Sequence, residues 1–205
     1  YYHGAPITEP GGWGGFYWSG TYAYNIGVAL NSQPHNYGKT WFPCVDEFTD
    51  RATYEFHVTT ASTYNAFCNG LLQDSTVNAN GTLTWNWHFN QTIPTYEAGV
   101  ADAPFYTLRR TYHGIPVQMA IMPADSNKTI TYFNKLDTVL GGYLSCYGPY
   151  PFDKIGYSIT PFGGGGMEHA TCIVIGSALV TTTLTYEYIA YHELSHMWFG
   201  DMVTC

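Results

Sequence analysis

The first 122 residues contain short apolar or alternating runs separated by turn residues, and this pattern constrains the fold more than any other feature. Asn69-Gly70, Asn80-Gly81 and His113-Gly114 fall between the runs, and Asn and Gly tolerate the positive φ angles of tight turns. Runs bounded in this way indicate antiparallel strands. We therefore expect residues 1–122 to form a β domain shaped as a sandwich or saddle. The runs are Gly15–Trp18, Thr53–Thr59, Leu83–Phe89, Phe105–Tyr112 and Val117–Ile121.

The pattern changes after this region, and residues 123–205 combine helical and strand-like segments. Ser126 can cap a helix from about Lys128 to Leu144, because apolar residues recur there at helical spacing. The sequence therefore predicts an α+β protein with an antiparallel N-terminal domain and a mixed second region. Two strands and a last helix are expected in the second region, at Lys154–Ile159, Thr171–Ile175 and Tyr186–Phe199.

The composition excludes several classes of protein. With 45% hydrophobic, 18% aromatic and 11% charged residues, the chain is too apolar for a disordered protein. The 7 basic residues are scattered among 15 acidic ones, so we expect no nucleic-acid partner. No window reaches the roughly 20 apolar residues that a membrane helix needs. The low lysine content favours a secreted or periplasmic protein and leaves a cytoplasmic location open.

The cysteines do not follow a pattern that indicates a structural staple. They number five and are widely spaced, without a CxxC pair. Neither a disulfide framework nor a thiolate zinc cluster is therefore expected. We interpret most of them as small buried hydrophobic residues.

A His-Glu-x-x-His motif lies near the C-terminal end, in Tyr191-His192-Glu193-Leu194-Ser195-His196. On a helix, residues four apart lie one turn apart on nearly the same face, so both imidazoles can reach one metal ion. Glu193 is about 100° around the helix from His192, where its carboxylate can face a water molecule instead. Zinc brings the pKa of such a water towards about 7, and the carboxylate can take its proton. We therefore predict a Zn²⁺ site with His192 and His196 as ligands and Glu193 as general base.

Chance explains this motif poorly, since the histidine and glutamate content predicts about 0.01 occurrences in a chain of this length. A second interpretation stays open, in which two core histidines are satisfied by backbone carbonyl groups. The apolar residues around the motif give the helix a face to bury, as the wall of a cleft requires.

Four segments together resemble the M1 zinc aminopeptidases of the gluzincin group. The segment from His192 to Thr204 resembles the zinc helix of the family with its Trp-Phe-Gly-Asp continuation. Gly165-Gly166-Met167-Glu168-His169 is similar to the Gly-x-Met-Glu-Asn loop of the family. The other two segments are Trp41–Glu47, which is similar to the Phe-Pro-Cys-x-Asp-Glu stretch, and Pro149–Phe152.

The resemblance implies an N-terminal β-saddle domain followed by a thermolysin-like catalytic domain, of which residues 123–205 are a part. It implies an aminopeptidase acting on peptides with a free N-terminus. Glu168 would then hold the α-amine of the substrate, and Gly165, Gly166 and Met167 would line the cleft beside an added peptide strand. His169 stands where the family has Asn, and an imidazole beside Glu168 could itself titrate.

The resemblance also implies a third zinc ligand, a glutamate about eighteen residues beyond His196 and therefore past Cys205. Glu187 lies about 140° around the helix from His192, and neither Glu168 nor Asp201 is a credible substitute. Asp201 could instead orient a histidine. We therefore expect the chain to be a fragment whose catalytic domain is truncated after the zinc helix, with the remainder in a longer protein.

Two alternatives to a peptidase remain open from the sequence. One is a catalytically inactive M1-like binding or surface protein without the third ligand. The other is an M1-like hydrolase that acts on a non-peptide substrate, since one branch of the family opens an epoxide.

Overall fold

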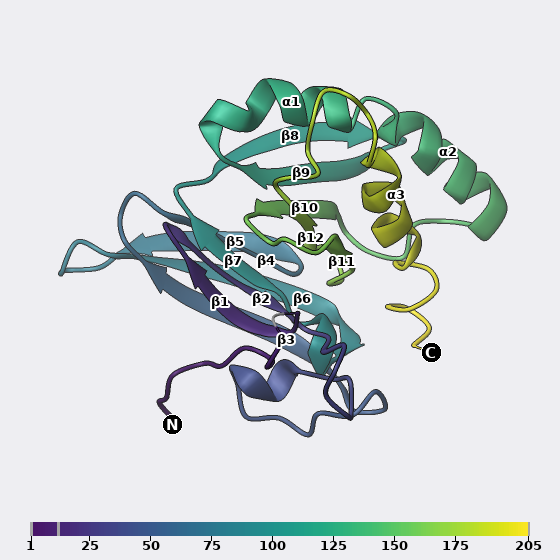
Figure 1. Ribbon diagram of the computed structural model, residues 1–205. Coiled ribbons are helices and arrows are strands. Elements are labelled where there is room, and N and C mark those ends of the chain that lie inside the picture. The colour runs from purple at the N-terminus through teal and green to yellow at the C-terminus, as the bar shows by residue number, and fades with distance from the viewer. Residues whose placement is uncertain (1, 12, 205) are drawn as a thin grey trace.

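The computed structural model describes residues 2–11 and 13–204, which form three sheets and three α-helices (Figure 1). The first 103 residues supply two antiparallel sheets. One has the order β1-β2-β7-β4 and the other β3-β6-β5. The α+β class and the antiparallel N-terminal domain are confirmed. The strands are β1 Gly15–Ser19, β2 Tyr22–Ile26, β3 Arg51–Thr60, β4 Asn65–Cys68, β5 Leu71–Val77, β6 Leu83–Pro94 and β7 Val100–Ala103, with short 3-10 turns at Gly38–Thr40 and Thr95–Glu97.

The third sheet has five strands in the order β11-β12-β10-β9-β8. β8 and β9 form an antiparallel hairpin, β10 runs parallel to β9 and β12, and β11 pairs antiparallel at the edge. Its strands are β8 Tyr106–Tyr112, β9 Ile115–Ile121, β10 Ile155–Thr160, β11 Gly166–Met167 and β12 Ile173–Gly176. The helices are α1 Ser126–Tyr132, α2 Leu136–Tyr147 and α3 Glu187–Ser195, and a 3-10 turn over Pro123–Asp125 precedes α1.

This third sheet begins earlier in the chain than the domain boundary that we expected at residue 122. The hairpin of β8 and β9 pairs with β10 and not with the first two sheets. We therefore propose a boundary near residue 104, between β7 and β8. The sequence pattern does not distinguish this boundary from the expected one, because hairpin strands look the same whichever sheet they join.

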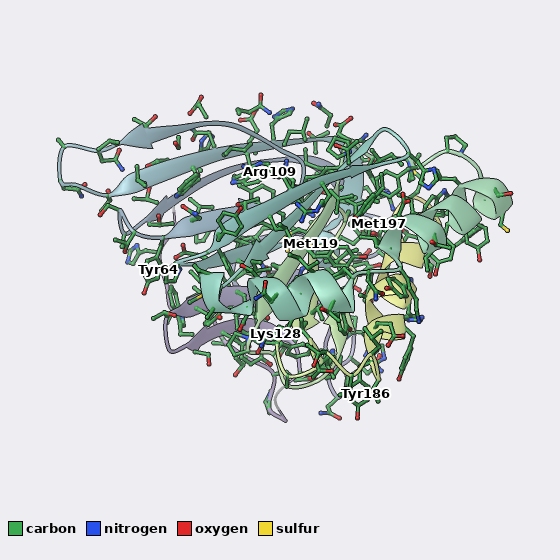
Figure 2. The ribbon with its side chains drawn as sticks, turned by 90° about the horizontal axis from the view of Figure 1, so that it is seen from above. Tyr64, Arg109, Met119, Lys128, Tyr186 and Met197 are labelled. Carbon is green, nitrogen blue, oxygen red and sulfur yellow. The ribbon has the colours of Figure 1, made fainter. Side chains whose placement is uncertain are left out.

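The central strands β10 and β12 of the third sheet are buried on both faces. Side chains alternate along β12, so Ile173 and Ile175 pack into a core with the helices, whereas Val174 packs into a core with the first two sheets. Every residue of β10 is buried, as expected for a central strand with parallel neighbours. Figure 1 shows α1 and α2 on the side of the sheet that faces away from the first two sheets. Met119 and Met197 belong to the helix-side core (Figure 2).

The helix predicted over Lys128–Leu144 is two helices separated by a turn after Tyr132. Tyr132 and Phe133 are both buried at this turn. The hydroxyl of Tyr132 then donates to the carbonyl of Tyr186 at 2.7 Å. Ser126 lies within α1 and its hydroxyl donates backwards to the carbonyl of Pro123, so it does not cap the helix as predicted.

Lys154 connects the third sheet to the N-terminal sheets at the start of β10. Its side chain is completely buried, and its Nζ donates to the carbonyl of Cys68 at 2.9 Å. The ammonium lies 4.1 Å from the ring centre of Trp87 and 4.3 Å from that of Phe67, an arrangement that attracts a cation. Burial nevertheless lowers the pKa of Lys154 to about 7, so the charge is costly at this position.

We predict opposite outcomes for two substitutions of Lys154. Lys154→Ala leaves a cavity between the aromatic rings and lowers the free energy of unfolding by about 2–4 kcal/mol. Lys154→Met fills the same space without a buried charge and changes it by less than about 1.5 kcal/mol. Urea unfolding of both variants measures the difference. Equal destabilisation by Ala and Met would show that the hydrogen bond, and not the packing, holds this junction.

Candidate metal centre and active site

The two motif histidines face each other at the end of α3. The Nε2 atoms of His192 and His196 are 3.3 Å apart, and their rings are nearly perpendicular. Two nitrogens that bind one tetrahedral zinc at roughly 2.05 Å lie about 3.3 Å from each other. The pair is thus spaced for a shared metal ion, with His192 exposed and His196 half-buried.

The turn after α3 sets the orientation of His196. Its Nδ1–H donates to the carbonyl of Phe199 at 3.1 Å, which leaves the Nε2 lone pair directed at a metal. Gly200 has a φ of 140°, and a Cβ there would lie 2.9 Å from Nδ1 of His196. The helix therefore ends at Ser195, four residues before the predicted end, because the chain must turn back to the imidazole.

Glu193 is buried between α3 and the edge strand β11. A Cβ at Gly166 would lie 2.5 Å from the carboxylate of Glu193, so a glycine is required for this approach. Burial, and secondarily the negative charge of Glu168, raises the pKa of Glu193 to about 8. Among the described residues, the three side chains His192, Glu193 and His196 form the group whose ligand atoms lie within 4.8 Å of one another.

Glu168 follows β11 directly and is half-buried on the side of the sheet edge where Glu193 lies. Gly165 and Gly166 are partly accessible, and Gly165 has a φ of 128°. The side chain of Met167, in contrast, is buried in the core shared with the N-terminal sheets. Only its backbone can therefore border a cleft, which narrows the predicted role of Met167.

Of the other acidic residues, Glu187 pairs with Lys135 at 3.2 Å, away from the histidines as its helical position predicted. Asp201 is completely buried, and its backbone N–H donates to the carbonyl of His196 at 3.0 Å. The orienting partner of the His196 ring is the carbonyl of Phe199 and not the Asp201 carboxylate, which has no hydrogen-bond partner.

Two residues that sequence reasoning missed lie beside Asp201. Glu97, from the 3-10 turn after β6, is completely buried, and burial raises its pKa well above the usual range. Arg51 donates from Nη2 to the carbonyls of Asp201 and Thr92 at 2.7 and 2.6 Å and from Nη1 to the hydroxyl of Thr204. No local sequence signal marks either residue. The segment that each one contacts lies over a hundred residues away in the chain or on the opposite sheet.

Arg51 thereby links β3 to the turn that orients His196. We predict that Arg51→Ala weakens zinc binding by roughly tenfold, a typical effect of losing an outer partner of a metal ligand. Arg51→Lys should recover part of the affinity, since an ammonium reaches fewer of the three oxygens. Competition with a chromophoric chelator measures the affinity, and Arg110→Ala, an exposed arginine on β8, is the control. An unchanged affinity in Arg51→Ala would refute the link.

His169 does not titrate near neutral pH, contrary to our expectation. It is completely buried, and desolvation lowers its pKa to about 3. The N–H of Gly27 donates to its Nε2 at 3.1 Å. A Cβ at Gly99 would lie 2.8 Å from its Nδ1, so the imidazole fits between two glycines of the N-terminal sheets.

Asn69 makes a second junction beside this imidazole. Its side-chain amide donates to the carbonyls of Glu97 and Ala170 at 3.0 and 2.5 Å, and the N–H of Gly99 donates to its Oδ1. The segment after Glu168 is therefore anchored to the N-terminal sheets by uncharged polar groups.

The buried His169 makes stability depend on pH. Its folded pKa lies below its unfolded value of about 6.5, so the unfolded chain binds an extra proton as the pH falls from 6.5 towards 3. The contribution of His169 to the free energy of unfolding is therefore fully present above pH 6.5. Below this pH it decreases by about 1 kcal/mol per pH unit. We predict that His169→Asn removes this slope. Urea unfolding between these pH values tests it, with His57→Asn on the exposed face of β3 as the control. A slope equal in wild type and His169→Asn would contradict the prediction.

Comparisons with known proteins identify relatives of this chain. Residues 15–96 match the Peptidase M1 N-terminal domain family. Aminopeptidase A of Gloydius brevicauda is 30% identical over 93% of the chain, and human glutamyl aminopeptidase is 28% identical over 86%. The chain belongs to the M1 peptidase family. It spans about a fifth of the length of these two relatives, 21% and 20%.

Solved structures of M1 enzymes share the fold over nearly the whole chain. A mutant of a two-domain M1 zinc metallopeptidase bound to L-arginine superposes with a TM-score of 0.79 at 24% identity, over 98% of this chain and 46% of the other. A mutant of the Deinococcus radiodurans enzyme bound to Tyr-Ser-Ala superposes with a TM-score of 0.76 at 25% identity, over the same shares. The M1 chain described here has no helix, among its described residues, of the length and apolarity needed to cross a membrane.

Proposed function

We propose that this chain carries the zinc site and the amine-binding site of an aminopeptidase that hydrolyses N-terminal peptide bonds. The observation that supports this best is the 3.3 Å spacing of the two Nε2 atoms beside the buried Glu193 carboxylate. The residues present fit a zinc ion, because both imidazoles offer a nitrogen to one point and one of them is held by a backbone carbonyl. His192 and His196 would hold the ion, and a third ligand stays a prediction for residues outside this sequence.

When bound, zinc would acidify a water molecule and polarise the carbonyl of the scissile bond. Glu193 would accept the proton from the attacking water and pass it to the leaving amine. Its raised pKa suits this role, because a base with a pKa near neutral takes up and releases a proton readily.

Glu168 would bind the α-ammonium group of the substrate. A carboxylate at a set distance from the metal accepts a charged ammonium and so selects the first residue of a peptide. The outer edge of β11 has no strand partner among the described residues, so the substrate backbone can pair with it as an additional strand. Peptides with a free N-terminus are therefore the proposed substrates.

We predict that Glu193→Gln in the complete, zinc-loaded protein retains the metal and loses about 10²–10⁴-fold in kcat for an aminoacyl anilide, because the ligands remain and the base is removed. Anilide release and metal content by atomic absorption measure the two effects. Glu187→Gln is a matched control, since it lies on the same helix and pairs with Lys135 instead of facing the site.

Three outcomes would contradict the proposal. Normal turnover by Glu193→Gln would refute the assigned base. Equal hydrolysis of free and N-acetylated anilides would refute amine recognition by Glu168, and failure to hydrolyse any anilide would favour the inactive binding protein or an enzyme for non-peptide substrates.

A further inference from the structure

A cavity lies away from α3, between the N-terminal sheets and the outer edge of the third sheet. It has a volume of about 450 Å³, within the range of roughly 300–1,000 Å³ that small ligands occupy in proteins. α3 packs against β11 and β12, whereas this cavity borders β8, which is the opposite edge strand of the same sheet. Its ligand would therefore not compete with a substrate at the zinc site.

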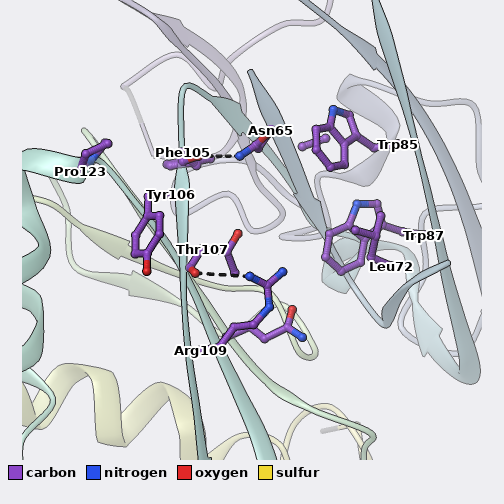
Figure 3. Close-up of a pocket in the computed structure, with 11 residues that line it drawn as sticks. Asn65, Leu72, Trp85, Trp87, Phe105, Tyr106, Thr107, Arg109 and Pro123 are labelled. Atoms are coloured by element: carbon purple, nitrogen blue, oxygen red, sulfur yellow. Dashed lines mark hydrogen bonds between the residues drawn. The ribbon is translucent and has the colours of Figure 1, made fainter. Parts of the chain in front are cut away.

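Two walls of the cavity are flat and apolar (Figure 3). Trp85 and Trp87 alternate on β6 and so point to the same face of that strand. Phe105, just before β8, forms the other wall, and Figure 3 shows it across the cavity from the two indoles. Tyr106 pairs with Ile121 of the helix-side core, so its ring lies on the opposite face of β8 from Arg109. Arg109 is exposed, so the cavity is accessible from solvent beside its side chain.

The polar groups of the cavity carry a single formal charge, that of Arg109. Arg109 pairs across the hairpin with Gln118, and directly opposed residues in an antiparallel pair share one face. The guanidinium reaches between the two aromatic walls (Figure 3). Its Nη1 donates a long hydrogen bond to the carbonyl of Thr107, at 3.5 Å. No Asp or Glu is among the residues that line the cavity, and the described residues give Arg109 no ion pair.

This charge is notable because the whole chain has a net charge of -8. An unpaired guanidinium in an otherwise acidic protein attracts an anion, and its planar fork matches a carboxylate. Aromatic side chains on both sides would then stack on a flat apolar body. We propose that this cavity is a binding site for a small aryl carboxylate, with Arg109 on the carboxylate and Trp85 and Phe105 on the ring.

Calorimetric titration of the chain with naphthalene-2-carboxylate and with naphthalene-2-carboxamide tests the proposal. The two probes share the ring system and differ in charge. We expect the carboxylate to bind about tenfold more tightly than the amide, which is the usual contribution of a charge-assisted hydrogen bond. Higher salt should reduce this difference, because Arg109 is exposed.

Arg109→Gln should lower the affinity for the carboxylate to that for the amide and leave zinc binding unchanged. Arg110→Gln is the matched control, because this neighbour is equally exposed but does not line the cavity, and it should bind the carboxylate as the wild type does. Trp85→Ala should weaken both probes to a similar extent, since it removes part of the stacking surface. The thermal midpoint of each variant verifies that it folds.

Three results would overturn the proposal: no binding of either probe, equal affinity for carboxylate and amide, or an equal loss in the Arg109→Gln and Arg110→Gln variants. None of them bears on the zinc site, since the variants leave His192, Glu193 and His196 untouched.

Discussion

The burial of the central strands β10 and β12 on both faces is the constraint on which the rest of the structure depends. Helices cover one face and the N-terminal sheets cover the other. Each fully buried aliphatic side chain in such a layer contributes about 1.5–3 kcal/mol. Because alternate residues of β12 supply both cores, the strand cannot slip by one residue without moving Ile173 and Ile175 out of the helix-side core. The edge strand β11 and the helix α3 are positioned by this register.

Polar groups buried between the N-terminal sheets and the third sheet then determine how the site is held. His169, Asn69 and Lys154 each reach across this boundary to a backbone group on the other side. Such groups are costly to bury and specific in their geometry, since each unmet hydrogen bond leaves a desolvated atom. Arg51 extends the same principle to the turn that orients His196. The N-terminal sheets thus contribute to the metal site without supplying a ligand.

Most strands with alternation or an apolar run were predictable. The expected strands that the structure contains are β1, β3, β6, β8, β9, β10 and β12, with ends that differ by a few residues. The strands β2, β4, β5, β7 and β11 were not predicted. β4 and β7 have four residues each, which is too short for a period to be measured, and β5 carries polar residues at most positions. The division of the strands among sheets was not predictable either, because hydrogen bonding between distant segments leaves no local trace. The single helix expected over Lys128–Leu144 was wrong, since the structure has two helices there, with Tyr132 and Phe133 buried at the turn between them.

By itself, the sequence identified the side chains of the candidate metal site, since a helix with histidines four residues apart places both on one face whatever surrounds it. It also indicated Glu193 as the base and Glu168 as the anchor for an amine. Only the tertiary structure decided how these groups are tuned and held. Burial against Gly166 raises the pKa of Glu193, the backbone of Phe199 orients His196, and residues of the N-terminal sheets reach the turn beyond α3. These effects depend on desolvation and on contacts between segments far apart in the chain, and neither is encoded in the spacing of a motif.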